Sequence, residues 1–439
     1  MKIKSLLFLL AFFCYFQKAK AQFIKVDDTF NAQHLVEKVL VNSSCAQVSN
    51  FSESGDTFTP SRKSLGFFDA NGTSFPFKQG IFFFFFSSNN TPGPFINQRG
   101  GGSKNWGGDA DLDAALGISS INASVIEFDF VPLTDYVSFN YLFASNEYQS
   151  YFPCDFSDGF AFLIKEKGST TPYKNLAVLP GTNIPVSSKI VHPLINPVQN
   201  GSATFEGCPA SYENYFNGYN TSNSPINYAG QTKVLTAETK VTAGKTYHIK
   251  LVVADDREEV FDSAVFIEAG SFSSKIDLEP DRLLATNNPV CFGESFLLNT
   301  NLPATNSFEW FRNGVKIISE NQPTYQVTSA GTYRVDVAFS PTCIISEEIK
   351  IEYAPDLILN NSSLVQCDID ADGLTIYDLS TTDAYFKSND TNITKTIWHL
   401  SLTDAQNSSN AITNLTSFSN TSPNQVLYVK ASSKYACSK

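Results

Sequence analysis

The sequence is poor in the residues that build zinc sites and in the motifs that mark common enzymes. It has four histidines among 439 residues and no C-x-x-C pair, so no zinc site is expected. It contains no G-x-S-x-G motif, and no Gly-Lys-Ser/Thr follows its glycine-rich run (100–108). A nucleophile elbow and a phosphate-binding loop are therefore excluded. These absences favour a binding protein over an enzyme.

Long apolar runs are also missing, apart from a short one at the start of the chain. Lys2 and Lys4 precede an apolar run at 5–16, which is followed by Ala19-Lys20-Ala21, the pattern of a cleaved export signal. That run is shorter than the roughly 20 residues that span a bilayer. The longest later run, Ile81–Phe86, predicts a buried strand. We therefore expect residues 1–21 to be a signal peptide and the rest to lack a transmembrane segment.

Positive charge is scarce too, because 31 basic residues face 43 acidic ones, for a formal net charge of −12. Loss of the leader would remove four lysines and no acid, and would move the charge to −16. Such a chain repels nucleic acid and anionic lipid and suits cations or neutral partners. The alternative is that the acids only keep an extracellular protein soluble. Charged residues make up 17% of the chain, which is typical of extracellular β-structure.

Recurring short strand patterns predict an all-β protein. Between residues 22 and 274, alternating or aromatic runs separated by Gly, Asn, Pro and Ser suit a large β-sandwich or jelly roll. The runs are Val125–Val131, Tyr136–Ala144, Phe160–Ile164, Thr246–Ala254 and Ser263–Ala269. The one helix that we expect here is Ala32–Val41, from its helical hydrophobic spacing.

Two smaller β modules are expected after this domain. Residues 277–354 have the features of an immunoglobulin-like sandwich, with Trp310 as its core tryptophan and Tyr333 as its corner tyrosine. Val335 stands where the antibody pattern has a cysteine, which favours the bacterial modules of this type. Residues 355–439 predict a third β module with hardly any room for a closing strand, so we expect the protein to continue.

Seven cysteines follow the leader and, in an exported protein, are expected to form disulfides. Spacing by module predicts three bridges and one unpaired cysteine. The bridges are Cys154–Cys208, Cys291–Cys343 and Cys367–Cys437, and the unpaired residue is Cys45. The first bridge is the least determined, because three cysteines in one domain allow three pairings.

Two groups of acids have the spacing of calcium ligands, which makes calcium the one expected cofactor. One group, in the third module, alternates before Gly373 as in an EF-hand loop, although Leu379 replaces the glutamate of the twelfth position. The other follows the glycine-rich run and could be completed by acids from elsewhere in the domain (Glu147, Asp155, Asp158 or Asp262), because Ca²⁺ takes six to eight oxygens. The groups are Asp368, Asp370 and Asp372, and Asp109, Asp111 and Asp113 with Glu147 and Asp158. The competing interpretation is that these carboxylates are solvated turn residues.

Aromatic residues gather in the same two loops of the first domain. Trp106 lies in loop 100–113, and Tyr148 and Tyr151 lie in loop 145–158. Rings that stack on a ligand, with acids or a cation to orient it, are typical of binding sites. These three residues predict the ligand-binding surface; the alternative is that the rings cap the sandwich core.

Seven segments, in order over residues 32–273, resemble the choice-of-anchor L domain of exported bacterial proteins. They are Glu127–Val131, Tyr141–Tyr148, Asp158–Leu163, Asn175–Thr182, Leu235–Ala237, Thr246–Lys250 and Asp262–Phe266. The last module resembles a unit repeated in the same long proteins, on Cys367-Asp368, Gly373, Tyr377–Leu379 and Cys437. The resemblance implies a surface protein of the adhesin-like or gliding-motility-associated kind, exported by type IX secretion through a sorting domain at its far C-terminus. No biochemical activity follows from it.

Three functions remain open at this stage. The first is a secreted, outer-membrane-associated adhesion protein whose first domain binds an extracellular glycan or protein on a stalk of β modules. A C-terminal region beyond this chain would attach it to the cell. The second is a secreted hydrolase with a catalytic or carbohydrate-binding β domain, and the third is a structural spacer of a surface filament.

Overall fold

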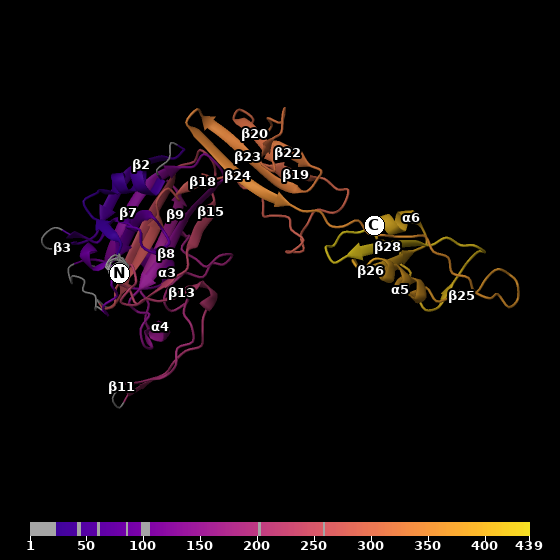
Figure 1. The fold of residues 1–439 in the computed structure, drawn as a ribbon, viewed down its shortest axis with the longest axis horizontal. Helices are drawn as coiled ribbons and strands as arrows, with labels where there is room; N and C mark the ends of the chain where they lie inside the picture. The colour runs from indigo at the N-terminus through magenta and orange to yellow at the C-terminus, as the bar shows by residue number, and fades with distance from the viewer. Residues whose placement is uncertain are drawn as a thin grey trace, which may run out of the picture. The chain divides into compact units, whose positions relative to one another are not determined.

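The computed structural model describes residues 23–439, except 42–44, 59–61, 85–86, 98–105, 201–202 and 258–259. The chain forms two compact units (Figure 1). The first comprises residues up to Ile276 together with Phe339–Ile345, and the second comprises Asp277–Ala338 and Ser346–Lys439. The expected signal peptide lies outside the described residues. No helix that the structure describes has the length and apolar character needed to cross a membrane.

The first unit is built on a nine-stranded antiparallel sheet. Its strands are β1 (Lys25–Asp27), β5 (Leu65–Asp69), β6 (Gln79–Phe84), β8 (Tyr136–Ser145), β13 (Phe216–Tyr219), β14 (Gly230–Thr232), β15 (Leu235–Lys240), β17 (Ser263–Glu268) and β18 (Ser273–Lys275). They follow the order β1-β5-β6-β17-β8-β14-β13, and β15 and β18 also pair with β8. The long β8 thus lies at the centre of the sheet.

A second sheet of five strands packs against the first. Its strands are β2 (Gln47–Ser54), β7 (Ser120–Val131), β9 (Gly159–Glu166), β10 (Lys174–Asn175) and β16 (Tyr247–Asp256), in the order β10-β9-β16-β7-β2. Aromatic rings join the two sheets: Phe143 of β8 stacks on Phe160 of β9 at 4.9 Å, and Tyr141 meets Phe162 edge-on at 4.9 Å. All four rings are buried, and each contributes about 1.5–3 kcal/mol of burial. The predicted β-sandwich is confirmed.

Helices of the first unit cover parts of this sandwich. The predicted helix at 32–41 is confirmed as α2 (Ala32–His34) continued by the π-helical η1 (Leu35–Val41). Helix α3 (Ala110–Leu116), which the sequence analysis overlooked, buries Leu112 against the outer face of the second sheet. The remaining small elements are β3 (Thr57–Phe58), β4 (Arg62–Lys63), η2 (Ser88–Asn90), α4 (Phe152–Asp155), β11 (Val198–Asn200), β12 (Ala203–Phe205) and η3 (Glu213–Tyr215).

Strand register brings four chain segments to one end of the sandwich. Ser145, the last residue of β8, pairs with Ser263, the first residue of β17. Gly159, the first residue of β9, pairs with Ala254, near the end of β16. The residues that flank these four strand ends therefore belong to the same region of the unit, although the ends are up to 118 positions apart in the sequence.

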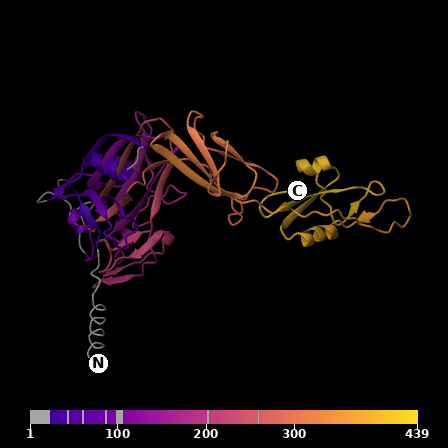
Figure 2. The same ribbon diagram turned by 45° about the horizontal axis from the view of Figure 1, so that its top comes forward.

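The second unit contains an immunoglobulin-like pair of sheets (Figure 2). The strands are β19 (Phe296–Asn299) and β22 (Thr324–Val327) in one sheet, and β20 (Ser307–Arg312), β21 (Val315–Lys316), β23 (Gly331–Ser340) and β24 (Cys343–Ile351) in the other. Trp310 is fully buried, and the Tyr333 hydroxyl donates to the Ser329 carbonyl at 2.8 Å. The predicted core tryptophan and corner tyrosine are both confirmed.

Two further strand pairs and two helices follow in the second unit. They are β25 (Ile376–Tyr377) with β27 (Phe418–Ser419), β26 (Ile393–His399) with β28 (Tyr428–Ser433), α5 (Ser380–Asn389) and α6 (Leu402–Asn407). Phe386 of α5 packs on Trp398 of β26 in a small core with Leu379. This part of the chain therefore has a separate core of its own.

Candidate functional site

The aspartates after the glycine-rich run shape helix α3. Asp109 is its N-cap residue and accepts a hydrogen bond from the Leu112 N–H at 2.9 Å. Asp113 lies in the first turn and accepts a hydrogen bond from the N–H of Ser120 at 2.7 Å. Ser120 lies just beyond the left-handed Gly117 that ends the helix. These contacts give two of the three predicted ligands a role in local folding.

A lysine from the second sheet pairs with two of these three aspartates. The ammonium of Lys250, on β16, lies 2.9 Å from Asp109, 2.5 Å from Asp111 and 3.1 Å from Glu127. Burial lowers the pKa of Lys250, but the three carboxylates outweigh it and raise that pKa above its usual value. Calcium binding at Asp109 and Asp111 stays a prediction, and a metal ion there would have to displace this ammonium group.

The three aromatic residues predicted to bind a ligand have different surroundings. Tyr148 is only 2% exposed, so it belongs to the core, as the alternative interpretation held, and it offers no ring face to a ligand. Trp106 is half-buried against the core and donates its indole N–H to the Ala123 carbonyl at 2.8 Å. Tyr151 stacks on Phe205 at 3.9 Å. Residues 100–105 of the predicted binding loop lie outside the described residues.

Glu147 and Asp158, two predicted calcium ligands, do come together. The Asp158 backbone N–H donates to Oε2 of Glu147 at 3.2 Å, and both side chains are buried. Asp262 just before β17, which the calcium prediction also considered, and Asp255 near the end of β16, which it did not, act electrostatically on Asp158. We call Glu147, Asp158, Asp255 and Asp262 the strand-end cluster.

Ionisation of this cluster is costly. Burial, followed by the charge of Glu147 and of the two other acids, raises the pKa of Asp158 well above its usual value, against a hydrogen bond from Ser263. Burial alone raises the pKa of Asp262 to about 7. At neutral pH, therefore, the acids of this cluster cannot all be ionised unless a counter-ion is present.

The acids of the third module stay together in a turn. Asp368, Asp370 and Asp372 have ligand oxygens within 4.8 Å of one another, the one such trio among the described residues. Asp368 accepts backbone N–H groups of Gly373 at 2.6 Å and of Ala371 at 3.1 Å, and the first of these lowers its pKa most. These hydrogen bonds close the turn, and calcium binding here stays a prediction.

The disulfides differ from those predicted. The bridge Cys154–Cys208 is confirmed. The predicted bridges Cys291–Cys343 and Cys367–Cys437 are wrong, because the structure pairs Cys45 with Cys343 and Cys291 with Cys437. Cys45 is therefore not the unpaired cysteine; within the described part of the chain that residue is Cys367, which is exposed. Module boundaries predicted the wrong partners because both bridges join positions far apart in the sequence.

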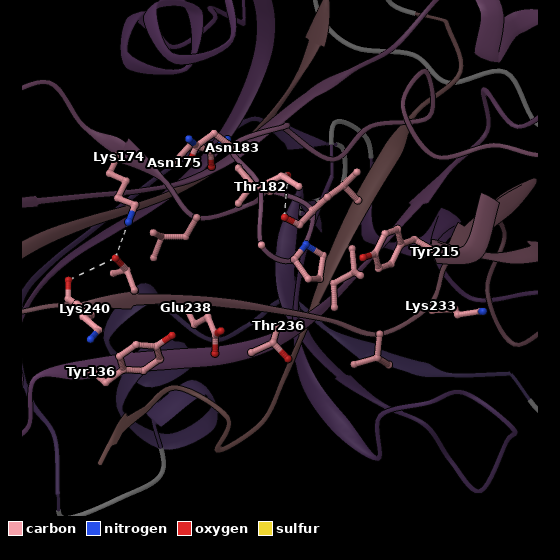
Figure 3. A pocket seen from close by; sticks show the side chains of 18 of the residues that line it. Tyr136, Lys174, Asn175, Thr182, Asn183, Tyr215, Lys233, Thr236, Glu238 and Lys240 are labelled. Atoms are coloured by element: carbon pink, nitrogen blue, oxygen red, sulfur yellow. Dashed lines mark hydrogen bonds between the residues drawn. The ribbon is translucent and has the colours of Figure 1, made fainter. Parts of the chain in front are cut away.

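A groove of about 930 Å³ runs beside strand β15 of the first unit (Figure 3). Strand β15 pairs only with β8 among the described strands. Figure 3 shows Thr236, Glu238 and Lys240 on this strand, facing Asn175 of β10 and a loop that carries Thr182 and Asn183. Its lining is rich in side chains that form hydrogen bonds, as a binding site for a polar ligand requires.

Lysines dominate the charge of this groove. Lys174, Lys233, Lys240 and Lys275 line it, against the single acid Glu238. Lys174 donates to the Thr239 hydroxyl at 2.8 Å (Figure 3), and the structure records no ion pair for Lys174, Lys233 or Lys275 with any described residue. In a chain of net charge −12 this is a local excess of positive charge.

The sequence analysis did not find this groove. Its lysines are dispersed between positions 174 and 275. The pairing of β15 and β18 with β8 places Lys240 and Lys275 on either side of Tyr136, and Lys174 comes from β10 of the other sheet. A usable signal was the segment Lys233–Lys240, in which a lysine stands at each end of an alternating strand.

Comparisons with known families agree with the resemblances drawn from the motifs. The sequence model of the choice-of-anchor L domain matches residues 24–273. The model of the Flavobacterium inter-domain disulphide bond domain matches residues 363–439. A search of the curated proteins finds no match to the chain.

Proposed function

The chain belongs to the choice-of-anchor L family, and on this premise we propose that it is an outer-membrane-associated adhesion protein whose first unit binds an acidic extracellular glycan. The two matched domains and three disulfides of the kind formed outside the cytoplasm make the chain an extracellular or surface protein. The ligand and the attachment are the proposal.

The observation that carries the proposal is the groove beside β15. Sugars are bound through hydrogen bonds to their hydroxyl groups and through contact of their apolar faces with aromatic rings. The groove offers both, with the side chains of Asn175, Asn183 and Thr236 and the ring of Tyr215 among its lining residues. Its volume lies near the upper end of the range typical of ligand sites, which suits several linked sugars.

The charge of the groove selects the class of glycan. Lys174, Lys233 and Lys275 carry positive charge without a recorded acidic partner, so carboxylate or sulfate groups of a polysaccharide would supply the missing counter-charge. The overall negative charge of the chain would repel such a polymer elsewhere on its surface. Binding would therefore be confined to the groove and weakened by salt.

A glycan array probed with the full secreted chain tests this proposal. We expect retention on uronate-containing or sulfated polysaccharides that falls as salt is raised. The double variant Lys233→Glu/Lys275→Glu should bind at least about tenfold more weakly, a loss of about 1.4 kcal/mol. The control Lys38→Glu/Lys78→Glu makes the same change in net charge at exposed lysines outside the groove, and should bind within about twofold of the parent chain.

Other results would reject the proposal. Equal losses in both double variants would show that net charge, not the groove, governs binding. Release of sugar fragments would favour the hydrolase, and failure to bind any glycan would favour a protein ligand or a structural spacer.

A further inference from the structure

The strand-end cluster lies where the two sheets of the first unit meet, at a place separate from the groove. Glu147 follows β8 and Asp262 precedes β17, both in the nine-stranded sheet. Asp158 precedes β9 and Asp255 lies in β16, both in the five-stranded sheet. The pairing of these strands therefore directs two acids from each sheet to one end of the sandwich.

Hydrogen bonds already link the two sheets through this cluster. Ser263, at the start of β17, donates its hydroxyl to Oδ2 of Asp158 at 2.6 Å. The Asp158 N–H and the Ser188 hydroxyl both donate to Oε2 of Glu147, at 3.2 and 2.5 Å. The Asn122 amide donates to Oδ2 of Asp255 at 2.8 Å. Neutral donors thus hold Glu147, Asp158 and Asp255, and the hydrogen bonds between Ser263, Asp158 and Glu147 connect the two sheets.

These donors leave buried oxygens without partners. Asp262 is 5% exposed, and its Oδ1 has no hydrogen-bond partner among the described residues. Among the described residues the structure records no hydrogen bond or ion pair to this carboxyl, and its like charge contributes to the raised pKa of Asp158. Oδ1 of Asn122, a residue with no exposed surface, is also unpartnered in the described part of the chain. A buried polar atom without a partner costs about 1–3 kcal/mol, so such atoms call for an explanation.

We propose that the strand-end cluster binds one Ca²⁺ ion, with carboxylate oxygens of Asp158 and Asp262 as its central ligands and Glu147, Asp255 and the Asn122 amide oxygen completing the shell. A divalent cation would neutralise like charges that repel one another in a buried place. The available ligands are all oxygens, which calcium prefers and zinc does not. Ca²⁺ accepts six to eight such oxygens in flexible geometry, whereas Mg²⁺ demands a near-ideal octahedron and keeps several waters.

Binding requires the carboxylates of the cluster to move closer together. No three of its carboxylate oxygens lie within 4.8 Å of one another, and oxygens that share one Ca²⁺ at 2.3–2.6 Å must come at least that close. The Asp262 side chain accepts no recorded hydrogen bond from the described residues, so its rotation is the movement with the lowest energetic cost. The ion would then cross-link the two sheets at this end of the sandwich.

The test is thermal unfolding of the full secreted chain in chelator, in calcium and in magnesium. Calcium at a hundredfold excess over its dissociation constant should raise the midpoint of the first unit by roughly 5–10 °C, and magnesium should raise it less. Asp262→Asn, which keeps the shape but removes the charge, should abolish the calcium shift. Asp370→Asn, in the acidic turn of the third module, should preserve it.

The absence of a calcium shift in the parent chain would overturn the proposal. So would a shift that persists in Asp262→Asn and disappears in Asp370→Asn. If Asp262→Asn does not fold, terbium luminescence of the Asp370→Asn chain decides the question, because Tyr148 adjoins Glu147 and can sensitise an ion held there. Emission that calcium displaces supports the site, and its absence rejects it.

Discussion

Replacement of Lys250 by methionine should destabilise the first unit strongly. The Lys250 side chain is 9% exposed, and its ammonium lies within 3.1 Å of three carboxylates, those of Asp109, Asp111 and Glu127. Methionine has nearly the same length and fills the same space, but it leaves the three acids facing one another without a cation. Asp109 also caps helix α3, so the repulsion would act on the helix that covers this face of the sheet.

The size of the effect follows from burial. Removal of one partner of a fully buried ion pair costs about 3–5 kcal/mol. The Asp111 and Glu127 side chains are 42% and 29% exposed, so water screens part of the repulsion in the variant. We therefore expect Lys250→Met to lower the free energy of unfolding by about 2–3 kcal/mol. Urea unfolding should show this as a lower midpoint with an unchanged slope.

An exposed lysine of the same unit provides the control. Lys245 pairs with Glu166 at 3.0 Å, with the two side chains 57% and 45% exposed, so Lys245→Met should cost less than about 1 kcal/mol. Equal small losses in both variants would refute the argument, because they would mean that water solvates the carboxylates around Lys250. Calcium should restore part of the lost stability in Lys250→Met only if Asp109 and Asp111 can act as ligands, which tests the expectation drawn from their spacing.

Three further predictions concern pH, a disulfide and a core ring. Asp129 is 2% exposed, and although burial raises its pKa, hydrogen bonds from Lys167 and two other side chains lower it to about 2. The folded state thus binds the carboxyl proton of Asp129 less tightly than the unfolded state does, so about 2 kcal/mol of stability present above pH 4 should be lost as the pH falls toward 2. The stability of Asp129→Asn should lack this acid-dependent loss, and an unchanged acid dependence in the variant would contradict the prediction. Replacement of Cys154 and Cys208 by serine opens a bridge with a sequence separation of 54 and should cost about 4 kcal/mol by the chain-entropy model, measured by urea unfolding; a loss below about 1 kcal/mol would argue against the bridge. Tyr148→Ala should cost about 3–5 kcal/mol of stability, because the ring of Tyr148 is buried. Tyr148→Phe should be nearly neutral, because the Tyr148 hydroxyl has no partner among the described residues. A small loss for the alanine variant would show that the ring lies at the surface.

Much of the fold was predictable because it depends on local patterns. The aromatic and alternating runs at Tyr136–Ala144 and Phe160–Ile164 became strands β8 and β9 with small shifts at their ends. Trp310 and Tyr333 marked the immunoglobulin-like core correctly, since their roles depend on spacing within one module. Helix α3 was missed although Asp109 and Gly117 are an N-cap residue and a C-terminal glycine with the expected spacing. The acids of that segment were interpreted as metal ligands, so the capping role of Asp109 was not recognised.

Disulfide pairing was not predictable in the same way, because spacing does not determine connectivity. The sequence argument assumed that each bridge closes within one module. Cys45 and Cys343 are separated by 298 positions, and Cys291 and Cys437 by 146. The segment Phe339–Ile345 contains the end of β23 and the start of β24, including Cys343. It belongs to the first unit, although the rest of both strands belongs to the second. No feature of the linear sequence marks that assignment.

The two kinds of acid cluster show the same distinction between local and long-range information. Asp109 and Asp111 have the alternating spacing of a calcium loop, yet the helix that they begin places both beside Lys250. Asp158 and Asp262 have no such spacing, since each stands alone just before a strand. The pairing of Ser145 with Ser263 and of Gly159 with Ala254 brings them to the same buried end of the sandwich. In a β-sandwich, therefore, strand register can bring single acids from distant strand ends together out of water, and the local spacing of acids in the sequence does not reveal such a cluster.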